Sequence, residues 1–91
     1  MVRESSTYTV YVLRSLKDGK HYTGFTSDLD RRLKEHNSGK TASTKRRRPF
    51  VVLYTETYDS KPEAAKREKF FKTSKGRDEL KNQLIGAVPK W

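Results

Sequence analysis

TVYVLRSLKDGKHYTGFT, residues 9–26, contains two short runs of β-branched and aromatic residues with Asp18-Gly19 between them. Asp-Gly between two such runs is a strong signal for an antiparallel β-hairpin, because both residues tolerate the positive φ of a tight turn. The stretch therefore predicts two paired strands, over residues 8–14 and 20–26, at the start of the fold.

A two-residue turn would place Leu13 opposite Gly24, and Tyr11 opposite Thr26. Opposed residues share a face, and so do residues two apart, so Tyr11 and Tyr22 project to the same side of the sheet. This register leaves the tyrosines about four residues, roughly 13 Å, apart along the strands, with room at Gly24 for a shared ligand. Two interpretations remain open, since strand tyrosines often serve only to pack the core.

The rest of the chain predicts three helices and one more strand. Apolar spacing and capping residues set their limits: a helix over 28–37 with Ser27 as N-cap, a strand over 50–57, a helix over 61–74 after a capping box that starts at Ser60, and a helix over 77–85 that directs Leu80 and Leu84 to the core. We expect a single α+β domain over residues 1–91, a small three-stranded antiparallel sheet flanked by helices in the order β-β-α-β-α-α.

The composition favours a nucleic-acid partner. Lysine and arginine total 21 against 11 acidic residues in a chain of 91, a formal net charge of +10 that attracts polyanions. No apolar run approaches the ~20 residues that span a bilayer, and the N-terminal residues have no apolar segment of a secretory signal. The absence of cysteine fits a reducing compartment. We expect a cytoplasmic monomer that binds nucleic acid, most simply DNA, and no membrane, with a protein partner left open.

The segment 40–49, KTASTKRRRP, has no apolar period and is predicted to be a basic loop. Its density of cations suits contact with phosphates better than a neutral solvated loop would. The candidate nucleic-acid-binding residues are Lys40, Lys45, Arg46, Arg47 and Arg48.

Glu68 falls on the inward arc of its predicted helix, between Ala65 and Phe71. A buried carboxylate needs a partner, because burying it alone costs several kcal/mol. The partner could be an arginine, the helix could turn to expose Glu68, or the carboxylate could hold a hard divalent cation with help from water and phosphate.

Arg32 lies at the edge of the apolar stripe formed by Leu29, Leu33 and His36 on the helix over 28–37. A helical arginine is commonly a solvated charge, but this position favours a guanidinium that points at a phosphate. His36 could be a boundary histidine that packs its ring or a group at the site.

Four motifs in this order resemble the GIY-YIG nuclease family, in particular its small stand-alone members. They are TVY at 9–11, YTG at 22–24, DLDRRLKEHNSGK at 28–40 and REKFFK at 67–72, which together span about residues 8–75. Thr9, Val10 and Thr23 depart from the family motifs without removing a functional side chain.

The resemblance implies a site made of five residues. Tyr11 and Tyr22 would be the paired tyrosines, with Tyr11 as the base, Arg32 would bind phosphate, His36 would support the site's edge, and Glu68 would bind the metal. It also implies cleavage of DNA phosphodiester bonds with one divalent metal, Mg²⁺ or Mn²⁺, in DNA repair or the processing of structured DNA.

The tyrosine base requires help from its surroundings. A phenol with a pKa near 10 is a poor base at neutral pH, so we expect nearby cations, Arg32 and the metal, to lower the pKa. The alternatives are a non-catalytic nucleic-acid-binding module on the same scaffold and a basic protein that docks on an acidic partner.

Overall fold

The computed structural model describes residues 7–42 and 44–87, with the side chains of all of them except residues 84–87. Within these residues the elements are β1 (Tyr8–Ser15), β2 (His21–Thr26), α1 (Leu29–Ser38), the 3-10 turn η1 (Lys45–Arg47), β3 (Phe50–Tyr58), α2 (Lys61–Phe70) and α3 (Ser74–Ala87). This confirms the predicted α+β class and the order β-β-α-β-α-α.

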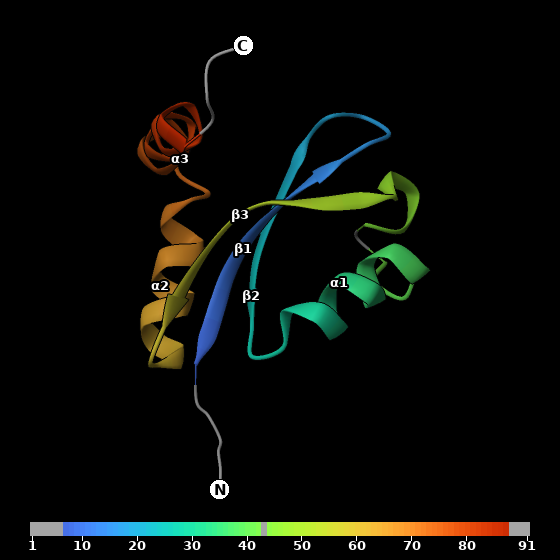
Figure 1. Ribbon diagram of the computed structural model, residues 1–91, viewed down its shortest axis with the longest axis horizontal. Coiled ribbons are helices and arrows are strands. Elements are labelled where there is room, and N and C mark those ends of the chain that lie inside the picture. Colours follow the sequence, from blue (N-terminus) through green and yellow to red (C-terminus); the bar gives the residue numbers. More distant parts are fainter. Residues whose placement is uncertain (1–6, 43, 88–91) are drawn as a thin grey trace, which may run out of the picture.

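The strands form one antiparallel sheet in the order β2-β1-β3, so β1 is the central strand. Its side chains alternate between two buried clusters. Val10 and Val12 pack with residues of α2 and α3, whereas Tyr11 and Leu13 pack with residues of α1. Helices α1 and α2 flank the sheet on opposite sides (Figure 1). The two tyrosines of interest therefore lie on the α1 side.

The hairpin register differs by two residues from the predicted one. Tyr11 pairs with Gly24, and Leu13 pairs with Tyr22. A shift of two preserves the alternation of faces, so the predicted shared face of Tyr11 and Tyr22 is confirmed. The predicted separation of the tyrosines is wrong, because the ring centroids lie only 6.4 Å apart.

The cause of the shift is a turn of four residues, 16–19, in place of the predicted two. The Ser15 amide donates to the Lys20 carbonyl at 2.9 Å and closes this longer turn. The buried Ser15 hydroxyl accepts hydrogen bonds from the amides of Lys17 and Asp18, both at 3.1 Å. These bonds replace the strand hydrogen bonds that the amides would make beside a two-residue turn.

Helix α1 begins one residue later than predicted, with Asp28 rather than Ser27 as its N-cap. The Asp28 carboxylate accepts the Arg31 amide at 3.1 Å, while the Asp28 amide donates to the Thr26 hydroxyl at 3.1 Å. The helix ends at Gly39, whose φ of 87° suits glycine and whose position agrees with the predicted stop.

Helices α2 and α3 meet at a turn that the sequence prediction misplaced. Helix α2 ends at Phe70 rather than near Ser74, and α3 begins at Ser74. Gly76, predicted to stop α2, lies inside α3, where the Thr73 hydroxyl accepts its amide at 3.0 Å. A Cβ atom at Gly76 would lie 1.8 Å from the Phe70 carbonyl oxygen, so glycine lets the two helices approach closely.

Arg67 links β3, α2 and α3 on the far side of the sheet from the tyrosines. Its guanidinium donates to Glu56 at 2.9 and 3.2 Å, contacts Glu79, and lies 4.5 Å from the centroid of the Phe71 ring. One alternative above gave Glu68 an arginine as its partner. The structure pairs Arg67 with Glu56 instead.

Leu80 is buried in this layer, as predicted, whereas the predicted core role of Leu84 lies outside the described side chains.

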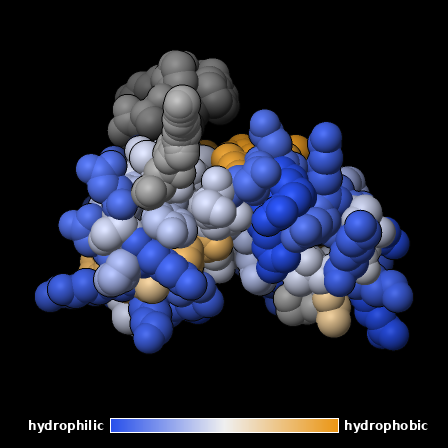
Figure 2. Space-filling model, turned by 90° about the horizontal axis from the view of Figure 1, so that it is seen from below, coloured by the Kyte–Doolittle hydropathy of each residue, from blue (hydrophilic) through white to orange (hydrophobic). Residues whose placement is uncertain are grey.

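Hydrophilic side chains cover both sides of the molecule when it is seen from below, with a pale and orange strip between them (Figure 2). None of the helices described here is long and apolar enough to cross a membrane.

Replacing Gly76 with alanine should lower the free energy of unfolding by about 2 kcal/mol, because the added methyl meets a backbone oxygen. Helix propensity alone predicts the opposite sign, a gain of ~1 kcal/mol. Urea denaturation measures the difference. Asn82→Ala, at an exposed position of α3, is the matched control and should stay within about 0.5 kcal/mol of wild type. A Gly76→Ala variant as stable as wild type would contradict the close approach.

Candidate active site

Three aromatic rings from three elements meet on the α1 side of the sheet. Tyr11 comes from β1, Tyr22 from β2 and His36 from α1. The Tyr22 and His36 centroids lie 4.8 Å apart and those of Tyr11 and His36 lie 6.0 Å apart, both with edge-to-face geometry. Phe50 packs below them, with its centroid 6.0 Å from that of His36. The register found for the hairpin is what brings both tyrosines to the same imidazole.

Gly24 accommodates the Tyr11 hydroxyl. A Cβ atom at Gly24 would lie 2.6 Å from the Tyr11 oxygen, which is closer than any side chain could tolerate. We predicted that this glycine leaves room for a ligand shared by the tyrosines. The structure instead fills that room with the Tyr11 side chain, and glycine here fixes where the hydroxyl sits.

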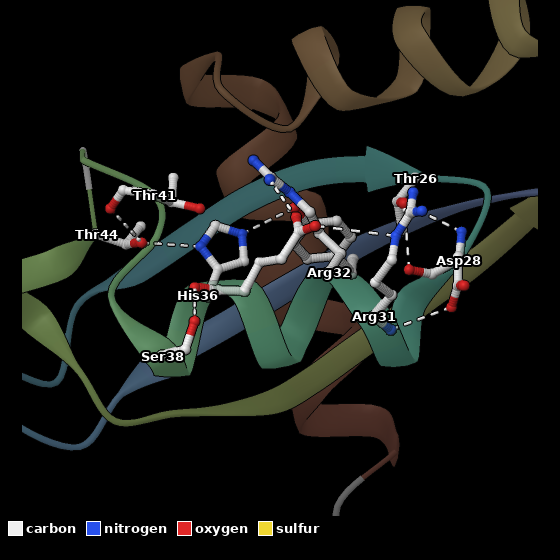
Figure 3. Close-up of polar contacts among 10 residues, drawn as sticks. Thr26, Asp28, Arg31, Arg32, His36, Ser38, Thr41 and Thr44 are labelled. Atoms are coloured by element: carbon white, nitrogen blue, oxygen red, sulfur yellow. Dashed lines mark hydrogen bonds and ion pairs between the residues drawn. The ribbon is translucent and has the colours of Figure 1, made fainter.

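His36 is fully buried, and both of its ring nitrogens have partners. Its Nε2 lies 3.1 Å from the Tyr11 hydroxyl, and its Nδ1 lies 2.9 Å from the hydroxyl of Thr44, which is also fully buried. The Thr44 hydroxyl donates its proton to the Thr41 carbonyl at 3.4 Å. Figure 3 shows these contacts from Thr41 through Thr44 to His36.

The contact from Thr44 to Thr41 favours one tautomer of His36. Because the Thr44 proton is directed to Thr41, its oxygen is free to accept, so Nδ1 of His36 carries the hydrogen. Nε2 then has the lone pair and accepts the Tyr11 proton. Burial, followed by the nearby Arg32 charge, lowers the pKa of His36 from its ordinary value and keeps the ring neutral.

Arg32 lowers the Tyr11 pKa, as the sequence predicted, but Arg32 alone does not bring the pKa below its ordinary value. Burial raises the Tyr11 pKa and outweighs the hydrogen bond to Arg32, which lowers it, while the charges of Tyr22 and Glu68 raise it further. Arg32 also donates to Glu35 at 2.9 Å. Tyr11 is therefore a neutral phenol at physiological pH.

Glu68 comes from α2, which flanks the other side of the sheet. Its side chain is only 17% exposed, and its charge is felt at the Tyr11 hydroxyl. The Lys72 ammonium, one turn later, donates to Glu68 at 2.8 Å. The side chain is mostly buried, as its predicted inward position requires, and the lysine that pairs with it lies in the turn after α2.

Glu68 suits a metal ion that takes only one or two of its ligands from the protein. No group of three or more histidine, aspartate or glutamate side chains gathers into a ready-made metal site in the described part of the chain. Mg²⁺ is commonly held by one or two carboxylates and takes its other ligands from water and substrate phosphate. Glu68, a single carboxylate with a mostly buried side chain, has this donor chemistry.

The predicted basic loop divides into structural and exposed cations. Arg47 donates to Asp18 at 3.1 Å and to the His21 carbonyl at 3.3 Å, and it lies 5.6 Å from the centroid of the Phe50 ring. It ties the loop to the hairpin, and its side chain is only partly exposed. The exposed members are Lys40, Lys45, Arg46 and Arg48.

A profile of the GIY-YIG catalytic domain matches residues 7–82. The chain therefore belongs to the GIY-YIG nuclease family, which confirms the resemblance predicted from its motifs. Within that family it is similar to small UPF0213 proteins.

Two of these relatives show the extent of the similarity. UPF0213 protein SSP2268 of Staphylococcus saprophyticus is 42% identical over 73 residues, 79% of this chain and 88% of that protein. UPF0213 protein YazA of Bacillus subtilis is 41% identical over 70 residues, 76% of this chain and 70% of that protein.

Two solution NMR structures share the fold. The E. faecalis protein EF2693 is 33% identical, with a TM-score of 0.58 over 97% of this chain and 95% of that one. The UPF0213 protein BH0048 of Bacillus halodurans is 39% identical, with a TM-score of 0.53 over 85% of this chain and 84% of that one.

Thr44→Val should destabilise the protein by about 2 kcal/mol, because the buried Nδ1–H of His36 loses its acceptor. In a His36→Phe background the same replacement removes no partner and should cost much less. Urea denaturation of the four proteins gives the coupling energy, which we expect to be at least about 1 kcal/mol. A coupling near zero would show that Thr44 does not hold His36.

Proposed function

We propose that this protein is a metal-dependent endonuclease that hydrolyses DNA phosphodiester bonds, in DNA repair or the processing of structured DNA. The observation that carries the proposal is the position of the Tyr11 hydroxyl. It lies 3.1 Å from His36 Nε2, and its pKa responds to two charged neighbours, Arg32, which lowers it, and Glu68, which raises it. Membership of the GIY-YIG family supports the same activity.

Tyr11 activates water by passing on its own proton. A phenol with a pKa near 10 costs about 4 kcal/mol to ionise at pH 7, and burial in this site adds to that cost. No free phenolate needs to accumulate if the transfers are concerted. As the attacking water gives a proton to the Tyr11 oxygen, the phenolic proton moves to Nε2 of His36.

Arg32 and Tyr22 act on the phosphate. The Arg32 guanidinium presents donors next to the Tyr11 hydroxyl, where negative charge on the non-bridging oxygens develops during attack. Tyr22 packs against His36 on the same face of the sheet, and its hydroxyl would hold the phosphate or the attacking water.

Glu68 would hold the divalent metal, Mg²⁺ or Mn²⁺. When bound, such an ion supplies stabilisation of the charge on the phosphate and the leaving oxygen. Lys72 now neutralises this carboxylate, and its side chain is 56% exposed, so it can withdraw toward solvent or toward DNA. The exposed cations of the basic loop supply affinity for neighbouring phosphates.

Glu68→Gln should reduce Mg²⁺-dependent cleavage at least ~10²-fold, because an amide holds a hard cation poorly. DNA binding without metal should remain. The assay is a panel of nicked, branched and single-stranded DNA substrates, with Mg²⁺, with Mn²⁺ and with chelator. Glu63→Gln, on the same helix and exposed, is the matched control and should cleave normally. Full activity in Glu68→Gln would refute the metal assignment.

Tyr11→Phe should lower kcat by about 10²–10⁴-fold, since it removes the proton acceptor and keeps the ring. Single-turnover cleavage measures the effect. Tyr8→Phe, on the α2 side of the sheet, is the control and should retain the wild-type rate. Unchanged turnover in Tyr11→Phe would return this residue to a purely packing role.

A module that only binds nucleic acid is the alternative outcome of these experiments. The ion pair between Glu68 and Lys72 favours it, because the carboxylate already has a partner. It predicts binding with steep salt dependence and no cleavage of any substrate in the panel with either metal.

A further inference from the structure

A cleft of about 740 Å³ lies on the opposite side of the sheet from the tyrosines. One wall is the end of the β1–β2 hairpin, and the other is formed by α3 and the turn that joins α2 to it. Thr23, which lines the cleft, pairs with Val12 and so shares its face of the sheet. The active-site proposal uses none of this surface except Lys72.

The walls of the cleft are basic. Lys20 and His21 contribute from the hairpin, Lys72 contributes from the turn between α2 and α3, and Arg77 and Lys81 contribute from α3. No acidic residue is among the lining residues that the structure describes. Cations that converge from two walls on one hollow concentrate positive potential there, which favours an anionic ligand.

The inner part of the cleft is apolar, because Phe71 and Leu80 also line it. A ligand that fits must therefore carry negative charge along its length and also present flat or apolar surface. Burial, followed by the charge of Arg14, lowers the pKa of His21, so its ring is a neutral imidazole on which a base can stack.

Lys72 connects the cleft to the candidate active site. It lines the cleft, and its ammonium donates to Glu68 at 2.8 Å. A phosphate in the cleft would compete with Glu68 for this ammonium. A strand bound there would thus lie directly beside the carboxylate assigned to the metal.

We propose that this cleft binds a single-stranded DNA segment that flanks the scissile phosphate. The inference rests on the proposed nuclease function and deepens it. In a duplex the bases are paired and stacked, and only groove edges and phosphates reach the surface. A single strand also exposes base and sugar faces, which suit the apolar interior and the His21 ring.

The test is the binding of a fluorescent thymidine oligomer of about ten nucleotides, measured by anisotropy in chelator so that no cleavage occurs. Arg77→Ala with Lys81→Ala should weaken binding about tenfold and reduce the salt slope by about 1.4, the value for two phosphate contacts on a single strand. Lys20→Ala, on the other wall, should weaken binding about threefold.

Lys66→Ala with Lys69→Ala is the control of equal charge. Both lysines are exposed on α2, and neither lines the cleft. The control pair should change the affinity for the oligomer less than twofold. A blunt duplex should lose no more affinity for the cleft variant, Arg77→Ala with Lys81→Ala, than for the control variant. Equal losses of oligomer binding in the two pairs, or no loss in the cleft pair, would overturn the proposal. Equal losses on oligomer and duplex in the cleft pair would also overturn it.

These outcomes separate the cleft from the nuclease activity. If the wild-type protein cleaves no substrate but the cleft variants lose oligomer binding, the cleft proposal stands and the proposed function falls. If the wild-type protein cleaves DNA and the cleft variants bind the oligomer normally, the proposed function stands and the cleft proposal falls.

Discussion

A neutral imidazole enclosed in the protein is the constraint on which the site depends. His36 has no access to water, so each ring nitrogen must find a partner inside the protein. The Thr44 hydroxyl lies 2.9 Å from one nitrogen and the Tyr11 hydroxyl lies 3.1 Å from the other, and the tautomer inferred above has Tyr11 donating. This arrangement holds the Tyr11 hydroxyl in place and gives its proton a destination, which a phenol of raised pKa requires if it is to act as a base.

The sheet and the site are mutually dependent. Gly24 lets the Tyr11 hydroxyl lie against β2, and the four-residue turn sets the register that pairs these two residues. The two-residue turn that the Asp18-Gly19 signal favoured would have kept the tyrosines apart. The Ser15 hydroxyl favours the four-residue turn, because it accepts two backbone amides of that turn. These hydrogen bonds stabilise the turn because the Ser15 side chain is buried.

Much of this could be predicted from the sequence, because the deciding signals are local. The alternation of strand residues gave the common face of Tyr11 and Tyr22, and helical spacing gave the inward position of Glu68. Thr44 could not be predicted as a partner of His36, since an unpatterned loop reaches the site only through tertiary packing. The same holds for Arg47, whose partners are distant in the chain, and for Gly76, whose role depends on how two helices meet.

The central claim is that His36 is a neutral acceptor for the Tyr11 proton, and its ring nitrogens can be followed by ¹⁵N NMR through a pH titration. The account predicts a hydrogen on Nδ1 and a bare Nε2 at neutral pH, with protonation only below the ordinary value of about 6.5. Folded stability should also fall as the pH drops through this range, because the unfolded chain takes up the proton first. A hydrogen on Nε2 at neutral pH, or protonation above the ordinary value, would contradict it.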